Sequence, residues 1–487
     1  MRGPELYGTP PTNVRWSADS RWIYFSWVEP GSSWRTPASD YRVRALPGSR
    51  PEKLTAAQID SAAPYTSEAI ASNDGRRGIE DVGGDIFLVD YRTEAVRRLT
   101  RTEARESNPV LGTDGKLVYF VRDGNAFSID LTSGLTTQLT DLRLGAKPVD
   151  SSGHKSAQKA RLEEQQRALF ESVREQIEAD SSATSERNIM NSLRNPEPIY
   201  VGRDRAIQSI SVSPNGRGAL VTLRTPSKAT QVEIPYWVTA SGYTEPQKGR
   251  TVVGDAQARV EMLYVSLPDL KVKKLHLFSN DSLASYAVVS GWDASGSNAL
   301  LTAFSPDNKQ RVIYSLSAAD GALHNVETLT DTAWVGGPCA RCAGWYDGGK
   351  RLWFVSEASG YAHLYTAAAQ GGDVQQLTNG KWEVLDVSLS PDGRSFDLIT
   401  NDPSPFDEHL FSLPVTGGKL TRVTTMPGRH TAIVSPDRRL VADVYSYVNR
   451  PPDLYVMSNR AGATESQLTI SPSAEFLQQK WLAPRIV

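Results

Sequence analysis

A repeat of about 45 residues that closes on the pair Leu-Thr constrains this chain more than any other feature. In most repeats a polar–apolar–aromatic triplet precedes the pair, and in three of them the Leu follows the first triplet residue by 14 positions. The pairs are Leu54-Thr55, Leu99-Thr100, Leu139-Thr140, Leu329-Thr330, Leu377-Thr378 and Leu468-Thr469, with a looser match at Val423-Thr424. The triplets begin at Asp85, Asn125, His363, His409 and Asp453. Self-similarity at this period is typical of the blades of a β-propeller.

Each repeat has the pattern of four short strands. A turn signal such as Ser390-Pro391-Asp392-Gly393 opens it, because proline presets φ and Asp or Asn tolerates the tight positions. An apolar run, the triplet strand, a turn with Gly and the strand ending in Leu-Thr then follow. Repeat ends near residues 55, 100, 140, 276, 330, 378, 425 and 469 predict an all-β fold, an eight-bladed β-propeller over residues 1–470.

The fourth repeat is oversized, and two insertions account for the excess. Residues 155–195 form a helical pattern with one apolar stripe, and residues 233–255 read as a long β-hairpin arm. The stripe consists of Leu162, Leu169, Phe170, Val173 and Ile177. We expect both insertions to project from blade four. The stripe then either packs on the propeller face or contacts another domain or chain, and a homodimer through these insertions is one arrangement that this allows.

Charge and hydropathy exclude two classes of partner. The 53 basic and 55 acidic residues give a net charge of −2, which offers no general attraction to nucleic acid. No stretch approaches the roughly 18 apolar residues that a membrane helix requires. Met1-Arg2-Gly3-Pro4 lacks the apolar core of a signal peptide, so we expect either a cytoplasmic protein or a leader outside this sequence.

The two cysteines, Cys339 and Cys342, form a lone C-x-x-C in a loop before a strand. Such a pair is a local disulfide, a pair of free thiols or a redox motif. Zinc requires four ligands and no second pair is present, so we predict no metal site. No cofactor motif is found either. The interpretation that we favour is a disulfide that staples the loop.

Several longer phrases carry a family resemblance. They are Ser356-Glu357-Ala358-Ser359-Gly360-Tyr361-Ala362-His363-Leu364-Tyr365, Leu377-Thr378-Asn379-Gly380-Lys381-Trp382-Glu383-Val384 and Arg450-Pro451-Pro452-Asp453-Leu454-Tyr455-Val456. With these phrases the chain resembles, over essentially its whole length, the propeller domain of the prolyl oligopeptidase family of serine peptidases, on its dipeptidyl-peptidase IV side. The resemblance implies a propeller that caps an α/β-hydrolase domain with a Ser-Asp-His triad.

The sequence lacks the Gly-x-Ser-x-Gly elbow in which such a serine nucleophile sits. We therefore predict no catalytic residue in this chain, which alone should be inactive. Residues 471–487 resemble the family's linker towards a hydrolase domain, which would be supplied in cis or as a separate chain. The predicted function is the substrate-gating portion of a serine exo- or oligopeptidase that acts on peptides. The resemblance and the C-x-x-C favour a periplasmic or secreted protein.

One acidic pair is a candidate for substrate binding. Dipeptidyl peptidases of the family hold the substrate's amino terminus with a Glu-Glu pair, since two carboxylates suit the donors of an ammonium. The one such pair here is Glu163-Glu164, within the helical insertion, where it also fits a solvated helix face. His363 and His409 occupy the triplet position and read as blade-architecture groups. The alternative function is a stand-alone TolB-like propeller that binds proteins or peptides.

Overall fold

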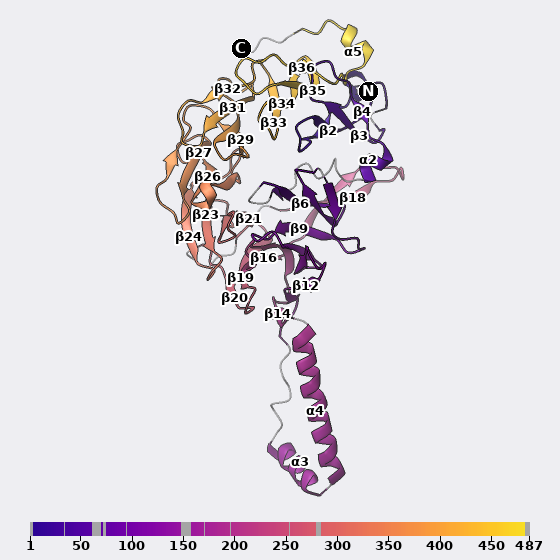
Figure 1. Ribbon diagram of the computed structural model, residues 1–487, viewed down its shortest axis with the longest axis vertical. Helices are drawn as coiled ribbons and strands as arrows, with labels where there is room; N and C mark the ends of the chain where they lie inside the picture. The colour runs from indigo at the N-terminus through magenta and orange to yellow at the C-terminus, as the bar shows by residue number, and fades with distance from the viewer. Residues whose placement is uncertain are drawn as a thin grey trace.

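The fold is built from four-stranded sheets. The structure, a computed structural model, describes residues 3–33, 35–60, 70–71, 75–93, 95–147, 157–169, 171–194, 196–252, 254–278 and 284–482. These residues form eight four-stranded antiparallel sheets, which lie in a ring (Figure 1). The predicted all-β propeller architecture is confirmed.

We number the sheets 1 to 8 in chain order. Sheet 1 contains β1 (Thr12–Trp16), β2 (Trp22–Trp27), β3 (Ser39–Arg44) and β4 (Glu52–Lys53); sheet 2 contains β5 (Ile70–Ala71), β6 (Arg77–Val82), β7 (Asp85–Asp90) and β8 (Ala95–Arg98); sheet 3 contains β9 (Glu106–Leu111), β10 (Leu117–Arg122), β11 (Asn125–Asp130) and β12 (Thr136–Gln138); and sheet 4 contains β15 (Ala206–Val212), β16 (Gly218–Thr225), β19 (Arg259–Ser266) and β20 (Val272–Lys274). Sheet 5 contains β21 (Tyr286–Trp292), β22 (Asn298–Phe304), β23 (Gln310–Ser317) and β24 (Leu323–Thr330); sheet 6 contains β25 (Ala343–Tyr346), β26 (Arg351–Ser356), β27 (His363–Ala368) and β28 (Gln375–Gln376); sheet 7 contains β29 (Val384–Leu389), β30 (Ser395–Thr400), β31 (His409–Pro414) and β32 (Thr421–Arg422); and sheet 8 contains β33 (Arg429–Val434), β34 (Leu440–Tyr447), β35 (Arg450–Ser458) and β36 (Ser466–Gln467).

Hydrogen bonds explain the Leu-Thr repeat. In sheet 2 the Leu99 N–H donates to the Ile86 carbonyl at 2.8 Å, and the Thr100 hydroxyl accepts from the Ile86 N–H at 2.8 Å. The pair thus fixes the fourth strand to the middle residue of the triplet through both backbone groups of that residue. The same threonine bond recurs at Thr140, Thr378, Thr424 and Thr469.

Apolar contact between neighbouring sheets supplies the core. The second and third strands read as apolar runs because both of their faces are covered, as in β26, where five of six residues are buried. Clusters of buried side chains lie between successive sheets, and one of them joins sheet 8 to sheet 1. There the Trp16 indole N–H donates to the Ile433 carbonyl at 2.9 Å, and the Asp437 N–H donates to the Ser20 hydroxyl at 3.0 Å. Contacts between sheet 8 and sheet 1 therefore close the ring.

The antiparallel order gives the ring two distinct faces. Turns from first to second and from third to fourth strands lie on one face. Connections from second to third strands, and the links between sheets, lie on the other, which we call the inter-sheet face. The chain enters β1 and leaves β36 on the inter-sheet face, where Ser473 donates to the Leu6 carbonyl at 3.0 Å.

Both insertions leave from the inter-sheet face. A helical arm, α3 (Ala157–Leu169) and α4 (Glu171–Arg194), lies in the link between sheets 3 and 4, next to the parallel pair β13 (Asp141–Arg143) and β14 (Pro198–Tyr200). A hairpin arm, β17 (Gln231–Tyr236) and β18 (Glu245–Thr251), joins β16 to β19. The remaining helices are α1 (Gly3–Tyr7), α2 (Ala56–Asp60) and α5 (Ala474–Gln478), and a 3-10 turn, η3, covers Asp347–Gly349.

The helical arm extends away from the ring (Figure 1). Leu162 is more than half exposed, so the expectation that this part of the apolar stripe packs on the propeller is wrong. Phe170 and the side chains of Leu169 and Val173 lie outside the described part of the chain. None of the described helices is both long and apolar enough to cross a bilayer.

Candidate functional site

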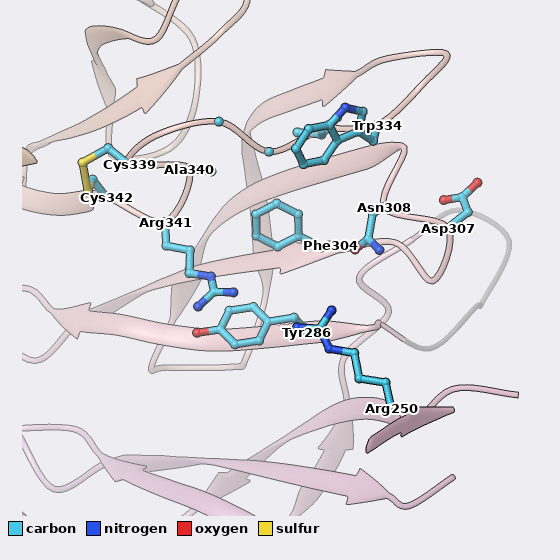
Figure 2. Close-up of a pocket in the computed structure, with 13 residues that line it drawn as sticks. Arg250, Tyr286, Phe304, Asp307, Asn308, Trp334, Cys339, Ala340, Arg341 and Cys342 are labelled. Atoms are coloured by element: carbon cyan, nitrogen blue, oxygen red, sulfur yellow. A yellow bond between two sulfur atoms is a disulfide. The ribbon is translucent and has the colours of Figure 1, made fainter. Parts of the chain in front are cut away.

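A pocket on the inter-sheet face lies between sheets 5 and 6 and the hairpin arm (Figure 2). Its volume is about 970 Å³. Tyr286 at the start of β21 and Phe304 at the end of β22 contribute from sheet 5. The link 331–342 forms a second wall, and Arg250 enters from β18. A pocket of this size is large enough for a small ligand or for two side chains of a peptide.

Aromatic rings form the apolar part of this pocket. Tyr286 and Phe304 meet edge to face with centroids 6.1 Å apart, and Phe304 is buried. Trp334 is 66% exposed, and its ring lies over Gly336, where a Cβ would come within 2.5 Å of it. The residue at 336 must therefore be glycine for the indole to keep this position.

Two arginines supply the charge. The Arg341 guanidinium carbon lies 4.1 Å from the centre of the Tyr286 ring, a cation–π contact that orients the side chain. Arg250 approaches the pocket from below in Figure 2. The Asp307 carboxylate at the rim accepts from the Ser305 hydroxyl at 2.6 Å and from the Lys309 N–H at 3.1 Å. These bonds lower its pKa and hold it in its own turn.

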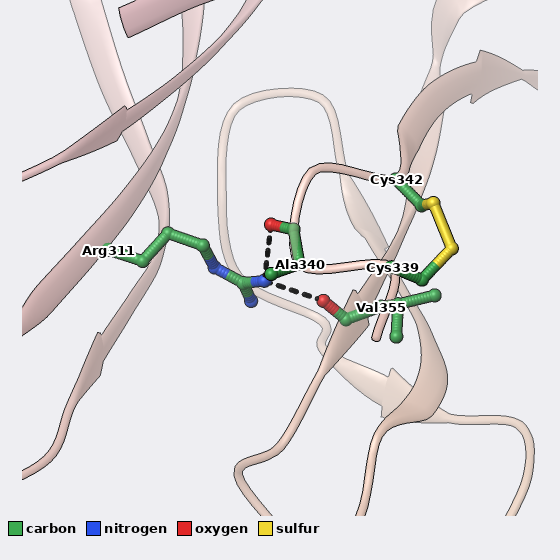
Figure 3. Close-up of a disulfide and its surroundings, with 5 residues drawn as sticks. All are labelled: Arg311, Cys339, Ala340, Cys342 and Val355. Carbon is green, nitrogen blue, oxygen red and sulfur yellow. Dashed lines mark hydrogen bonds between the residues drawn. A yellow bond between two sulfur atoms is a disulfide. The ribbon is translucent and has the colours of Figure 1, made fainter. Parts of the chain in front are cut away.

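The loop that carries Arg341 is fixed at several points (Figure 3). Cys339 and Cys342 form a disulfide on either side of Ala340 and Arg341. The buried Arg311 of β23 donates to the Ala340 carbonyl at 3.0 Å and to the Val355 carbonyl at 2.8 Å. The loop conformation therefore depends on a covalent bond and on a guanidinium that crosses from sheet 5.

The charge of Arg311 is balanced inside the protein. Its guanidinium donates to the Glu327 carboxylate at 2.6 Å, and this carboxylate also accepts from the Ser356 hydroxyl. The side chains of Arg311 and Glu327 are 2% and 12% exposed, so both ions are nearly removed from water. A pair buried in this way is stable only while both partners remain.

Glu357 supports the same link from sheet 6. Burial, and then repulsion by Glu383, raises the pKa of Glu357 above its usual value. A Cβ at Gly337, where φ is +77°, would lie 2.3 Å from a Glu357 carboxylate oxygen. Both the backbone conformation and the close carboxylate therefore require glycine there.

Metal binding at the cysteines has no chemical basis here. The sulfurs of Cys339 and Cys342 lie within 4.8 Å of a carboxylate oxygen of Asp386. Because the sulfurs are bonded to each other, neither is a thiolate that could ligate an ion.

The predicted substrate-binding pair lies elsewhere. Glu163 and Glu164 are on α3, at the end of the helical arm far from the ring (Figure 1), and Glu164 is exposed. The structure does not bring them to the pocket. Their proposed role in holding an amino terminus stays a prediction.

The buried histidines form polar contacts within the sheets. His363 contacts the Thr378 hydroxyl at 3.0 Å, and His409 contacts the Thr424 hydroxyl at 3.1 Å. Sequence reasoning missed a third group, His430 with Asp443, whose nitrogen and oxygen lie 2.5 Å apart with both side chains fully buried. Because these side chains are out of reach of a peptide, we assign them to the architecture of sheets 6, 7 and 8.

Comparison with known protein families shows which family the chain belongs to. A sequence model of the dipeptidyl peptidase IV (DPP IV) N-terminal region matches residues 206–452, which is half of the chain. The chain belongs to the DPP IV N-terminal region family. The match to this DPP IV family includes the pocket, the disulfide loop and the hairpin arm, whereas the helical arm precedes it.

Two solved structures have the same fold as this chain. Dipeptidyl peptidase 4 of Porphyromonas gingivalis is 15% identical, with a TM-score of 0.58 over 98% of this chain. A protein described as a dipeptidyl aminopeptidase IV from Bacteroides ovatus is 13% identical, with a TM-score of 0.53 over 96% of this chain. The alignments cover 62% and 60% of those two proteins, so the chain spans less than two thirds of their length.

Proposed function

We propose that this chain is the substrate-gating propeller of a serine peptidase, residues 1–470, and that residues 471–487 lead to an α/β-hydrolase domain on the inter-sheet face. The propeller admits peptides to the catalytic domain and excludes folded proteins. The family membership supports the peptidase context, and the asymmetry between the two faces of the ring supports the position of the second domain.

The exposed aromatic side chains carry this proposal. Among the described residues eight aromatic side chains are exposed, and all of them lie on the inter-sheet face or on segments that leave it: Tyr7, Tyr236, Trp237, Tyr243, Trp334, Tyr361, Phe406 and Trp481. On the opposite face the exposed large apolar residues are aliphatic and scattered: Leu46, Leu135, Val272, Val374 and, at the end of β33, Ile433. Exposed aromatic surface on one face is typical of a protein–protein contact.

Chain direction agrees with this arrangement. The last strand, β36, ends on the inter-sheet face, and α5 follows there beside α1 (Figure 1). A domain that continues the chain would start on the face that carries the exposed aromatic residues. The pocket opens on that same face, so a peptide held in it would lie between the propeller and the second domain.

The test compares two proteins from the same gene. The product of the complete natural gene and the 487-residue chain are assayed with chromogenic dipeptide and oligopeptide substrates, with and without a serine-directed phosphonate. We expect phosphonate-sensitive hydrolysis by the complete product and none by the 487-residue chain. Phosphonate-sensitive turnover by the purified 487-residue chain would contradict the proposal. A complete gene product without a Gly-x-Ser-x-Gly segment would instead favour the TolB-like binding module.

A further inference from the structure

The pocket of Figure 2 has the chemistry of an anion site beside an aromatic floor. We propose that it binds the carboxylate of a peptide, at the C terminus or on an Asp or Glu side chain, with a bulky apolar side chain next to that carboxylate. This inference rests on the proposed peptide-handling function. It adds a specificity that neither the family membership nor the fold supplies.

The two arginines are available for a ligand. Neither Arg250 nor Arg341 forms an ion pair with a carboxylate in the part of the chain that the structure describes. The Asp307 carboxylate at the rim is satisfied by Ser305 and Lys309 of its own turn. Two guanidinium groups without a carboxylate partner among the described residues favour an anion and disfavour an ammonium, and a guanidinium can hold a carboxylate through two parallel hydrogen bonds.

The position of Arg341 is fixed by contacts at its backbone and at its guanidinium. The residue lies between the two bonded cysteines, and the carbonyl of Ala340 just before it accepts from buried Arg311 (Figure 3). Its guanidinium rests on the ring of Tyr286. A side chain that is held at its backbone and at its guanidinium loses less entropy on binding than a free surface arginine would.

The aromatic floor selects the neighbouring group. Phe304 forms the buried base of the pocket, while Tyr286 and Trp334 stand at its sides (Figure 2). The volume of about 970 Å³ leaves room for an apolar side chain beside the carboxylate. Burial of such a side chain against aromatic rings is favourable in proportion to the apolar area removed from water.

The experiment uses unreactive probes and the 487-residue chain. Isothermal titration calorimetry compares acetyl-Trp-Glu-amide with acetyl-Trp-Gln-amide, and acetyl-Trp-Ala acid with acetyl-Trp-Ala amide. N-acetylation removes the amino-terminal charge, so a Glu-Glu pair cannot contribute. We expect the charged member of at least one pair to bind roughly tenfold more tightly than its neutral partner. The pair that shows the preference identifies the side-chain or the terminal carboxylate as the ligand group.

Variants locate the site. We expect Arg341→Gln and Arg250→Gln to remove most of the preference for the charged probe while binding of the neutral probe changes little. Arg439→Gln, on an exposed arginine of the opposite face, is the matched control and should leave the preference intact. Equal binding of charged and neutral probes, no binding of any probe, or the same loss in the Arg439 variant would overturn the proposal.

The two proposals fail separately. Hydrolysis by the complete gene product without a carboxylate preference in the 487-residue chain would remove the pocket proposal and leave the proposed function in place. A carboxylate preference in the chain, with no phosphonate-sensitive hydrolysis by the complete product, would remove the proposed peptidase function and leave the carboxylate site in place.

Discussion

Single threonine side chains hold the outer strands of this propeller. Each of them places a hydroxyl where a backbone N–H of the triplet strand would otherwise be buried without a partner. In sheet 3 the Thr140 hydroxyl is fully buried and accepts from the Ala126 N–H at 2.9 Å. A valine there would keep the shape of the side chain but remove the acceptor.

We therefore expect Thr140→Val to lower the free energy of unfolding by about 1–3 kcal/mol, the cost of an unsatisfied buried N–H. Urea denaturation followed by tryptophan fluorescence measures the change. Thr132→Val, on an exposed threonine in the neighbouring turn, is the control and should stay within about 0.5 kcal/mol of the wild type. Equal losses for the two variants would show that the buried bond is not the cause.

Asp453 is the first residue of the triplet in sheet 8, and its carboxylate also fixes the segment that follows the last strand, β36. Its carboxylate accepts from the Thr469 hydroxyl at 2.9 Å and from both the N–H and the hydroxyl of Ser471 at 2.8 Å. The Ser471 hydroxyl in turn accepts from the Trp27 indole N–H at 3.1 Å. One side chain thus connects the first sheet, the last sheet and the segment that follows them.

Burial raises the pKa of Asp453 from 3.8 to about 6. Between these values the folded protein holds a proton that the unfolded chain has lost, so this group makes stability fall as pH rises from about 4 to 6. We expect wild type to lose stability relative to Asp453→Asn across that window, by at most about 1.4 kcal/mol per pH unit. Urea midpoints of both proteins from pH 4 to 7 measure it, and a constant difference would contradict the assignment.

The link 331–342 holds one of the two arginines of the proposed binding site in place. Its position depends on the disulfide, on Glu357 and on Arg311, while Val335 donates to the Asn308 carbonyl at 2.7 Å. An inter-sheet link with so many fixed points is suited to present a charged side chain in one orientation.

Arg311→Met tests the strongest of these supports. The change leaves the Glu327 carboxylate buried without its partner, so we expect the free energy of unfolding to fall by about 3–5 kcal/mol. Arg429→Met is the control. It breaks the ion pair with Glu408, in which the Arg429 side chain is largely exposed, and it should cost at most about 1 kcal/mol. The double variant Arg311→Met, Glu327→Gln should recover part of the loss. No recovery would mean that packing, and not the unpaired charge, sets the cost.

Elements with a strong internal pattern could be predicted from sequence. The strand ends follow the Leu-Thr pairs because those residues make the same two bonds in repeat after repeat, and the helical arm follows from one apolar stripe. Whether that stripe is buried could not be predicted, because Leu162 has the same place in the helical periodicity whether it is covered or exposed. The pocket could not be predicted either, because Arg250 lies on the hairpin arm and Arg341 in the link between sheets 5 and 6, and the two line one pocket only in the folded chain.

The ring as a whole has two faces that differ in their surface residues. The inter-sheet face carries α1 and α5, both arms, the pocket and every exposed aromatic side chain of the described residues. The other face carries tight polar turns such as Ser390–Gly393, in which the hydroxyl and carboxylate bond within the turn. Such a division is expected when one face is covered by another domain and the other remains in water.

Hydroxyl-radical footprinting can show whether a second domain covers the inter-sheet face. Oxidation rates of Trp334, Tyr361 and Phe406 are compared between the 487-residue chain and the complete natural gene product, with Leu46 and Leu135 of the opposite face as internal controls. We expect the three aromatic residues to become several-fold less reactive in the complete product, while the two leucines do not change. Unchanged oxidation of all three aromatic residues in an active peptidase would contradict it.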